Sequence, residues 1–140
     1  IKDDSSYVIL EDVLSGTAIS SIYKTISGKD ISAEEVVKLF EVDDPIAIQV
    51  IDGFTITLAE AISDLALIFI SGNGIYLAGG LIRSLSKIIN TDLFIKSFIS
   101  NKKLVHKSML NDMPIGVVNR EHTCLHGNLN FFNLRNNKLS

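Results

Sequence analysis

Apolar residues recur at helical spacing along most of the chain, and this periodicity predicts a fold built mainly from α-helices. Between Ser5 and Ser27, two apolar sets at this spacing are separated by Gly16, which predicts two helical segments with a break at the glycine. Gly28 follows the second set and is placed to end that helix, because glycine readily adopts the left-handed conformation common at helix C-termini. The N-terminal region is therefore expected to be helical.

Polar residues mark the starts of two further helices. Ser32 with Glu35 three positions later is a capping-box pattern, which predicts a helix to about Phe40. Asp43-Asp44-Pro45 then opens a much longer helix, since proline in the first helical turn lacks only an N–H that would have no partner there. The turn-forming residues Ser71-Gly72-Asn73-Gly74 are expected to end it.

The long stretch from Ile46 to Ile70 is apolar enough to raise the question of a membrane span, which needs about 20 residues. A carboxylate near the middle of a bilayer costs about 3 kcal/mol, and this stretch carries four polar residues on one narrow helical face. These residues are Gln49, Asp52, Glu60 and Asp64. We therefore expect a core helix that is buried on most sides, no membrane partner, and some apolar surface that faces protein outside this chain.

Two short apolar runs after the long helix, residues 75–78 and 115–118, have the length and flanking residues of buried strands. Helices are predicted at 81–90, at 92–99 with Thr91 as the N-cap, within 102–113, and at 122–134. Strands separated by helices imply a parallel, right-handed β-α-β connection, so the fold class is α/β. Because two strands do not make an independent sheet, its other strands are expected to lie outside this chain.

Charge and cysteine content exclude some classes of protein. The 140 residues include 13 lysines and arginines against 16 aspartates and glutamates, a net charge of −3, so no nucleic-acid partner is expected. Cys124 is the single cysteine, which excludes an internal disulfide and fits a reducing, cytoplasmic location. The sequence starts at Ile1 without a basic and apolar leader, so we expect no signal peptide and interpret the chain as a piece of a longer protein.

The strongest local candidate for binding chemistry is Leu77-Ala78-Gly79-Gly80-Leu81, a predicted strand followed by two glycines and a helix. Glycines without Cβ atoms let a flat ligand or a phosphate approach the backbone closely, and the start of a helix offers unpaired N–H groups. A tight turn without any ligand is the alternative, because the sequence is neither a Walker A loop nor a G-x-G-x-x-G fingerprint.

A second candidate is the pair of adjacent carboxylates in Glu11-Asp12-Val13-Leu14-Ser15-Gly16. Such a pair near a helix start commonly serves only to stabilise the helix dipole. Alternatively, one carboxylate points into a cleft and accepts hydrogen bonds from hydroxyl groups, as a sugar site requires. In that case Ser15-Gly16 would supply the sharp change of chain direction.

Two other groups of residues are interpreted as having no catalytic or ligand-binding role. His122 and His126 would share a helical face, but Cys124 would point to the opposite side and a fourth ligand is lacking, so no metal site is predicted. The basic cluster within residues 102–107 is interpreted as a solvated loop, with a phosphate contact as the alternative.

Three segments, in order along the chain, resemble bacterial glucokinases. Residues 11–16 resemble the stretch that opens the last third of those enzymes, where Glu-x-Val-Leu-Ser-Gly-Pro-Gly is usual. Residues 74–81 resemble their adenosine-binding element, and residues 113–118 resemble their final strand. The resemblance extends from about Tyr7 to Leu134, with the long apolar helix between the first two segments.

This resemblance implies a fold, a reaction and site residues. It implies that residues 1–140 are a single partial domain, the helix-rich C-terminal portion of a ribonuclease-H-like domain of the actin-like ATPase type with two parallel strands. It implies ATP-dependent phosphorylation of the glucose 6-hydroxyl with Mg²⁺, in a cytoplasmic glycolytic enzyme that is a homodimer or is completed by an N-terminal half. It also implies that Glu11 binds glucose and that Gly79 and Gly80 bind the nucleotide.

Departures from the family pattern limit what this chain is expected to do alone. Thr17-Ala18 replace the usual Pro-Gly, and residues 122–127 replace a closing turn of small residues. The family's Asp-x-Gly-Gly-Thr phosphate loop and its Asn-Asp base motif are absent, so no catalytic residue is assigned and the isolated chain is expected to be inactive. The alternative function is a non-catalytic remnant of a sugar kinase that serves in oligomerisation or interaction.

Overall fold

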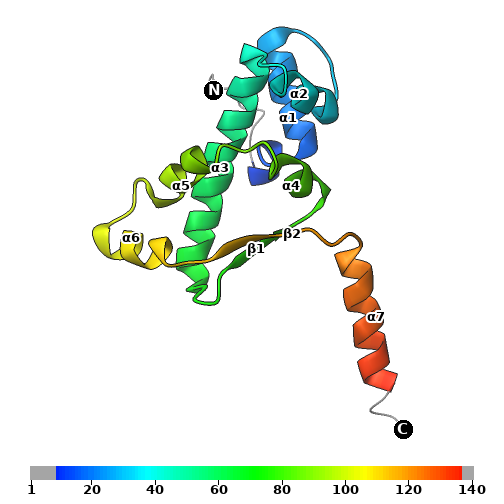
Figure 1. Cartoon of the computed structure of the whole chain (residues 1–140), viewed down its shortest axis with the longest axis vertical. Helices are drawn as coiled ribbons and strands as arrows, with labels where there is room; N and C mark the ends of the chain where they lie inside the picture. Colours follow the sequence, from blue (N-terminus) through cyan, green and yellow to red (C-terminus); the bar gives the residue numbers. More distant parts are fainter. Residues whose placement is uncertain (1–8, 137–140) are drawn as a thin grey trace.

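The chain folds around one long helix. The computed structural model describes residues 9–136, apart from the side chains of residues 123, 124 and 136, so the predicted helical start at Ser5 lies outside the described residues. In chain order the elements are η1 (Leu10–Asp12), α1 (Gly16–Ser27), α2 (Ala33–Phe40), α3 (Pro45–Phe69), β1 (Ile75–Ala78), α4 (Gly80–Leu85), α5 (Thr91–Ile99), α6 (Leu104–Asn111), β2 (Ile115–Val118) and α7 (Thr123–Asn136). Helices α1, α2 and α5 pack against α3, the strands follow at its C-terminal end, and α7 points away from the body (Figure 1).

Local capping interactions fix the first two α-helices where the sequence predicted them. The Ser15 side chain caps the N-terminus of α1, and Gly28 ends this helix in the left-handed conformation with φ of 75°. In α2 the Ser32 Oγ accepts a hydrogen bond from the Glu35 N–H at 3.2 Å, and the Glu35 carboxylate accepts one from the Ser32 N–H at 2.9 Å. Because the hydrogen bond from the Ser32 N–H favours the charged carboxylate, it lowers the pKa of Glu35. The helix break and the capping box are both confirmed.

Helix α3 carries most of the hydrophobic core. It starts as predicted, because the Asp44 side chain accepts hydrogen bonds from the N–H groups of Ile46 and Ala47 at 3.1 and 2.8 Å, while Pro45 occupies the first turn. Along its length the buried side chains recur at helical spacing and meet α1, α2 and α5. The buried apolar residues of α3 are Ala47, Val50, Ile51, Phe54, Leu58, Ala59, Ile62 and Ala66.

Burial along α3 is less complete than the sequence suggested. Among the described helices, α3 is long and apolar enough to cross a membrane, and half of its most apolar window is buried inside the fold. Burial on most sides does not hold at the C-terminal end, where Ile68 and Phe69 are 69% and 73% exposed, and this exposure agrees with the expectation that the chain leaves part of the apolar surface uncovered. The neighbouring helices cover the N-terminal and middle turns, so this end of α3 lacks a covering element among the described residues.

The two short strands form a parallel pair, as predicted. Ile75 lies opposite Ile115 and Tyr76 lies opposite Gly116, and the Ile75 N–H donates to the Pro114 carbonyl at 2.9 Å. Ile75 and Ile115 pack against the core, whereas Tyr76 on the other face is 68% exposed. The Tyr76 ring lies over Gly116, where an added Cβ would sit 3.2 Å from the ring. The sheet is thus covered on one face only, so the prediction that both strands are buried is wrong.

Three predicted boundaries are corrected by the structure. Helix α4 ends at Leu85 rather than near residue 90, because the Leu85 carbonyl accepts hydrogen bonds from the N–H groups of both Ile88 and Ile89, which turns the chain. The N-cap of α5 is Asn90 rather than Thr91, since the Asn90 Oδ1 accepts from the Leu93 N–H at 3.0 Å. The last helix begins one residue later than expected and extends to residue 136.

Ile70 ends α3 in a conformation that β-branched residues rarely adopt, with φ of 50° and ψ of 54°. Its side chain is 73% exposed, so little packing is lost on substitution. We expect Ile70→Asn to raise the free energy of unfolding by about 1 kcal/mol, because asparagine tolerates the left-handed region. Urea denaturation followed by circular dichroism measures this change. The control is Ile68→Asn, an equally exposed position inside the helix, which should give no gain; a gain at both positions would contradict the explanation.

Candidate functional site

Glu11 lies in the short 3-10 helix η1, where its neighbour Asp12 takes the structural role. The Ile9 N–H donates a hydrogen bond to the Asp12 carboxylate at 2.9 Å. The Glu11 side chain is exposed, and among the described residues no hydrogen bond or ion pair engages its carboxylate. Helix α1 has its own cap in Ser15. Stabilisation of a helix end therefore explains Asp12 but leaves Glu11 available for a ligand.

The backbone around Glu11 is held from both sides. The carbonyl of Leu10 accepts hydrogen bonds from the N–H groups of Val13 and Leu14, at 3.1 and 2.9 Å. Leu14 packs against the hydrophobic core, which anchors the C-terminal side of this turn. Consequently the position of the Glu11 backbone is set by the fold, while its carboxylate extends into solvent.

The two glycines between β1 and α4 are exposed, as a close approach by a ligand requires. Gly79 has φ of 137° and ψ of 159°, a conformation essentially confined to glycine, and nothing lies within 4 Å of where its Cβ would be. Gly80 begins α4, and the nearest atom to its absent Cβ is the Arg83 Nη2 at 3.9 Å. The backbone conformation, rather than crowding, is therefore what demands glycine at position 79.

Arg83 is a candidate site residue that the sequence analysis missed. Its guanidinium lies beside the exposed backbone of Gly80, so it places a positive charge and several N–H donors at the glycine turn. A basic residue three positions after the second glycine, on the short helix that follows, was the available signal. An anionic group approaching this turn would meet the Arg83 side chain.

The carboxylate and the glycine turn belong to segments that share one core. Leu14, which follows η1, and Leu81 and Ile82, which follow Gly80, all pack against the same cluster of buried residues. Because that cluster is centred on α3, the fold holds both segments against a common support. The core thus fixes each candidate segment relative to the rest of the protein.

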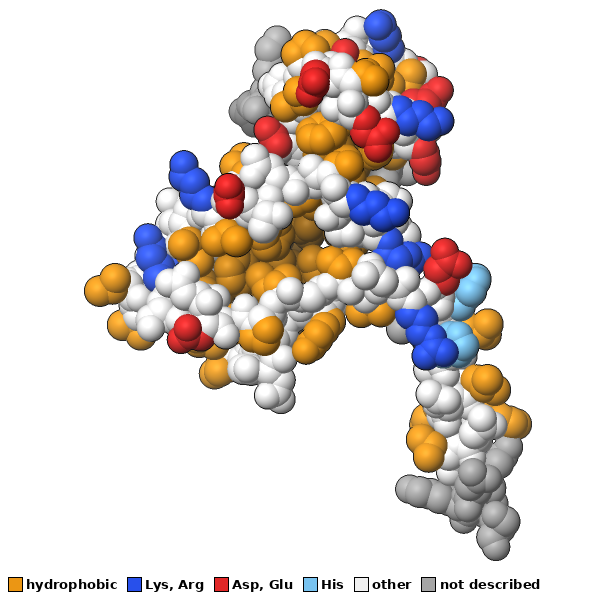
Figure 2. Space-filling view, viewed as in Figure 1, with side chains coloured by type: hydrophobic (Ala, Val, Ile, Leu, Met, Phe, Trp, Pro, Cys, Tyr) orange, Lys and Arg blue, Asp and Glu red, His pale blue; other side chains and the backbone are white. Residues whose placement is uncertain are grey.

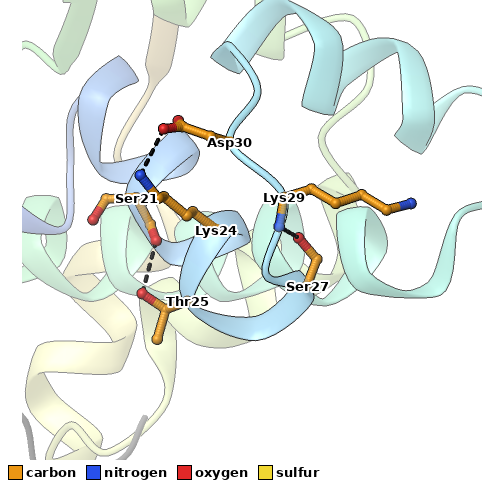
Figure 3. Close-up of polar contacts among 6 residues, drawn as sticks. All are labelled: Ser21, Lys24, Thr25, Ser27, Lys29 and Asp30. Carbon is orange, nitrogen blue, oxygen red and sulfur yellow. Dashed lines mark hydrogen bonds and ion pairs between the residues drawn. The ribbon is translucent and has the colours of Figure 1, made fainter.

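An open groove of about 510 Å³ lies between α1 and α2 and was not foreseen from the sequence. It is lined mainly by small polar side chains from the start of α1 and the start of α2. Lys24 and Asp30, which both line the groove, form an ion pair at 2.6 Å (Figure 3). Close by, the Thr25 hydroxyl donates to the Ser21 carbonyl at 2.9 Å (Figure 3). The groove's lysine and one of its carboxylates are thus engaged with each other, and this exposed pair adds little stability.

The histidines, the cysteine and the basic cluster singled out in the sequence do not form a binding site within the described residues. No group of three or more His, Cys, Asp or Glu residues that could hold a metal ion occurs there, and the Cys124 side chain lies outside them. His126 Nδ1 is 3.5 Å from the Arg120 guanidinium. The basic cluster is not the solvated loop that was predicted, because part of it lies in α6 and Lys102, 14% exposed, pairs with the exposed Asp64 on the surface of α3.

Comparisons with known proteins agree on one family. The family model described as Glucokinase matches residues 1–134. The chain is 27% identical over 124 residues to the glucokinase of Chelativorans sp., covering 84% of this chain and 36% of that protein. It is 26% identical over 133 residues to the glucokinase of Cupriavidus metallidurans, covering 89% of this chain and 39% of that protein. A third relative is the "Bifunctional protein glk" of Paraburkholderia xenovorans, which is 26% identical over 129 residues. That match covers 87% of this chain and 20% of the relative. The chain spans less than two fifths of the length of these relatives.

Proposed function

The chain belongs to the glucokinase family, and from that premise we propose that it is the C-terminal portion of a hexose kinase. The complete enzyme would transfer the γ-phosphoryl group of ATP to the 6-hydroxyl of glucose. The single observation that carries the proposal is the family match over nearly the whole chain. Glucose is proposed as the substrate because the relatives are glucokinases. In this proposal the two strands are part of the sheet of a ribonuclease-H-like domain, and the complete enzyme is a cytoplasmic homodimer.

Glu11 is the residue that we propose for sugar binding. Its carboxylate is exposed and uncommitted, whereas the adjacent Asp12 is engaged in η1. An ionised carboxylate accepts hydrogen bonds through both oxygens, so it suits a ligand that presents neighbouring hydroxyl groups. Charge-assisted hydrogen bonds of this kind are stronger than neutral ones.

Gly79 and Gly80 are the residues that we propose to lie against the nucleotide. Both are exposed, and the space where their Cβ atoms would be is open. The Arg83 guanidinium beside Gly80 would pair with the phosphate groups. Mg²⁺ bound to those phosphates would neutralise charge during the transfer, but the described residues contain no cluster of potential metal ligands. A complete set of protein ligands for the ion would therefore need residues from the completing portion of the enzyme.

A chimera tests the proposed reaction. This chain would replace the matching segment of the Chelativorans glucokinase, and the product would be assayed for glucose- and ATP-dependent turnover in a coupled assay. We expect turnover by the chimera and none by the isolated chain, because phosphoryl transfer needs a general base and phosphate loops that this sequence lacks. A folded chimera without activity would contradict the proposal.

A non-catalytic interaction module is the second candidate, and the exposure of α7 favours it. All of the described side chains of α7 are exposed, including five large apolar ones at positions 125, 129, 131, 132 and 134. Calorimetric titration of the folded chimera with glucose and with ATP·Mg²⁺ separates the two candidates. Saturable binding supports the kinase, and absence of heat with either ligand supports the interaction module.

Gly80→Ala tests the proposed nucleotide contact without disturbing the fold. Because Gly80 is exposed in the first turn of α4 and a Cβ there meets no atom closer than 3.9 Å, we expect the stability to change by less than about 0.5 kcal/mol. In the chimera the methyl group would instead hold the nucleotide away from the backbone and raise the KM for ATP roughly tenfold. Steady-state kinetics measure this. The matched control is Gly53→Ala on α3, also in open space, for which the KM for ATP should stay unchanged.

A further inference from the structure

Charge is unevenly distributed along the chain, and two segments carry opposite signs. Residues 93–111, which include most of α5 and all of α6, contain four lysines and no acidic residue. Residues 30–44, which include α2 and the turn before α3, contain six carboxylates and one lysine. Figure 2 shows basic and apolar side chains together where α6 lies, and acidic side chains at the end of the molecule where α2 lies. This acidic chain therefore carries a distinct basic surface.

The basic surface includes apolar side chains that the fold leaves uncovered. In the first turn of α6, Leu104 and Val105 are 85% and 79% exposed. Lys103 and Lys107 flank them, and among the described residues no hydrogen bond or ion pair engages either ammonium group. We call these four residues the basic patch. An apolar pair with free cations at its edges suits a partner that presents an apolar group between carboxylates.

The turn between α2 and α3 presents that opposite pattern. Val42 is 71% exposed and lies between Glu41 and Asp43 in the sequence. Neither carboxylate has a hydrogen-bond or ion-pair partner in the part of the chain that the structure describes. The Leu39 carbonyl holds the turn, since it accepts a hydrogen bond from the Val42 N–H at 3.2 Å. Residues 41–43, which we call the acidic turn, thus form a fixed projection with an apolar centre and acidic edges.

One charge of each surface stands at a helix end where the helix dipole disfavours it. Lys103 is the N-cap of α6, its side chain makes no capping hydrogen bond, and the first turn of this helix contains no acidic residue. Glu41 is the C-cap of α2. Positive charge is unfavourable at a helix N-terminus, and negative charge at a C-terminus. Contact between the two ends would bring Glu41 to the start of α6 and Lys103 to the end of α2, so both dipole interactions would become favourable.

The two surfaces lie too far apart to meet within one molecule. Lys102, next to the basic patch, pairs with Asp64 of α3, whereas the acidic turn leads directly into the start of α3 at Pro45. From Pro45 to Asp64 the helix rises about 28 Å, at about 1.5 Å per residue. Pairing of the surfaces would therefore join different molecules.

We propose that the acidic turn of one molecule binds the basic patch of a second copy of this chain. The apolar side chains would meet at the centre of the contact, and carboxylates would pair with lysines at its edges. Because each molecule presents one surface of each kind, the contact is head to tail and extends into an open chain of copies rather than a two-fold dimer. The proposal does not depend on the proposed reaction.

Sedimentation velocity of the whole chain at increasing protein concentration tests this contact. Exposed ion pairs are weak and are screened by salt. We therefore expect the sedimentation coefficient to keep rising with concentration at about 0.02 M salt, and the association constant to fall roughly tenfold at about 0.2 M salt. A chain that stays a single copy throughout, or an assembly that stops at two copies, would overturn the proposal.

Charge reversals locate the contact. Lys103→Glu and Glu41→Lys should each weaken the association roughly tenfold, because each places like charges opposite one another. Neither should destabilise the fold, since each puts at its helix end the charge that the dipole favours, as circular dichroism would verify. The matched control is Lys87→Glu, the same change at an exposed lysine outside both surfaces, which should leave the association unchanged.

The variant that carries both reversals should recover the association, because its two surfaces are again complementary. Equal association of the parent and both single reversals, or no recovery in the double variant, would overturn the proposal. The same comparison in the chimera shows whether the portion that precedes this segment covers either surface. We expect the chimera to depend on Lys103 and Glu41 in the same way; dependence in the chain but not in the chimera would assign the basic patch to a contact within one complete enzyme and overturn the contact between copies.

Discussion

Glu11→Ala in the chimeric enzyme is expected to raise the KM for glucose roughly tenfold to a hundredfold. A hydrogen bond to a charged group contributes about 1.5–3 kcal/mol. Among the described residues no side chain or backbone group pairs with the Glu11 carboxylate, so the loss of a contact within the protein would not account for the change in KM. The side chain is exposed, so the fold should be unaffected. Steady-state kinetics with varied glucose, at saturating ATP, measure the change.

The control for this substitution is the neighbouring carboxylate. Asp12→Asn keeps a side-chain oxygen that can accept the hydrogen bond from the Ile9 N–H, so η1 should be preserved. We expect its KM for glucose to change by less than about twofold, consistent with the small effect of most surface substitutions. Equal glucose affinities for the parent chimera and Glu11→Ala would remove Glu11 from the sugar site.

Gly74→Ala is expected to lower the free energy of unfolding by about 2–5 kcal/mol, as the sum of backbone strain and steric overlap. Gly74 has φ of 101°, and a Cβ built there would lie 2.6 Å from the Pro114 carbonyl oxygen. That same oxygen accepts the hydrogen bond from the Ile75 N–H, so the clash would displace β1 from β2. The change would be measured as a fall in the urea midpoint.

Gly72→Ala, in the same turn, is the matched control for Gly74→Ala. The nearest atom to a Cβ at position 72 is the Ile70 carbonyl oxygen at 4.0 Å, so no overlap arises. We expect its urea midpoint to stay within experimental error of the parent chain. A loss of stability of similar size in both variants would contradict the explanation by backbone strain and by overlap with the Pro114 carbonyl oxygen.

The candidate site was predicted from the sequence only in part. The exposed glycine turn followed from two glycines after an apolar run, because the absence of Cβ atoms is a local property. The residues alone left the choice between Glu11 and Asp12 open, since it depends on which carboxylate the Ile9 N–H reaches, and only the family resemblance implied Glu11. Arg83 was missed because its proximity to Gly80 depends on its side-chain conformation.

By itself, the sequence determined the caps at the starts of α2 and α3 and most of the element order. Ser32 with Glu35, and Asp44 with Pro45, complete their interactions within a few residues, so no distant contact is needed to fix them. The early end of α4 escaped prediction because Leu85 is fully buried and its carbonyl accepts two hydrogen bonds from the following turn.

Tertiary structure alone decided the contacts between residues far apart in the chain. The register that places Tyr76 over Gly116, and the pairing of Lys102 with Asp64, join segments whose separation no local pattern encodes. It also decided which part of the long apolar helix is covered. Helical periodicity marks the apolar faces of a helix, but only the packing of α1, α2 and α5 determines that coverage stops before Ile68.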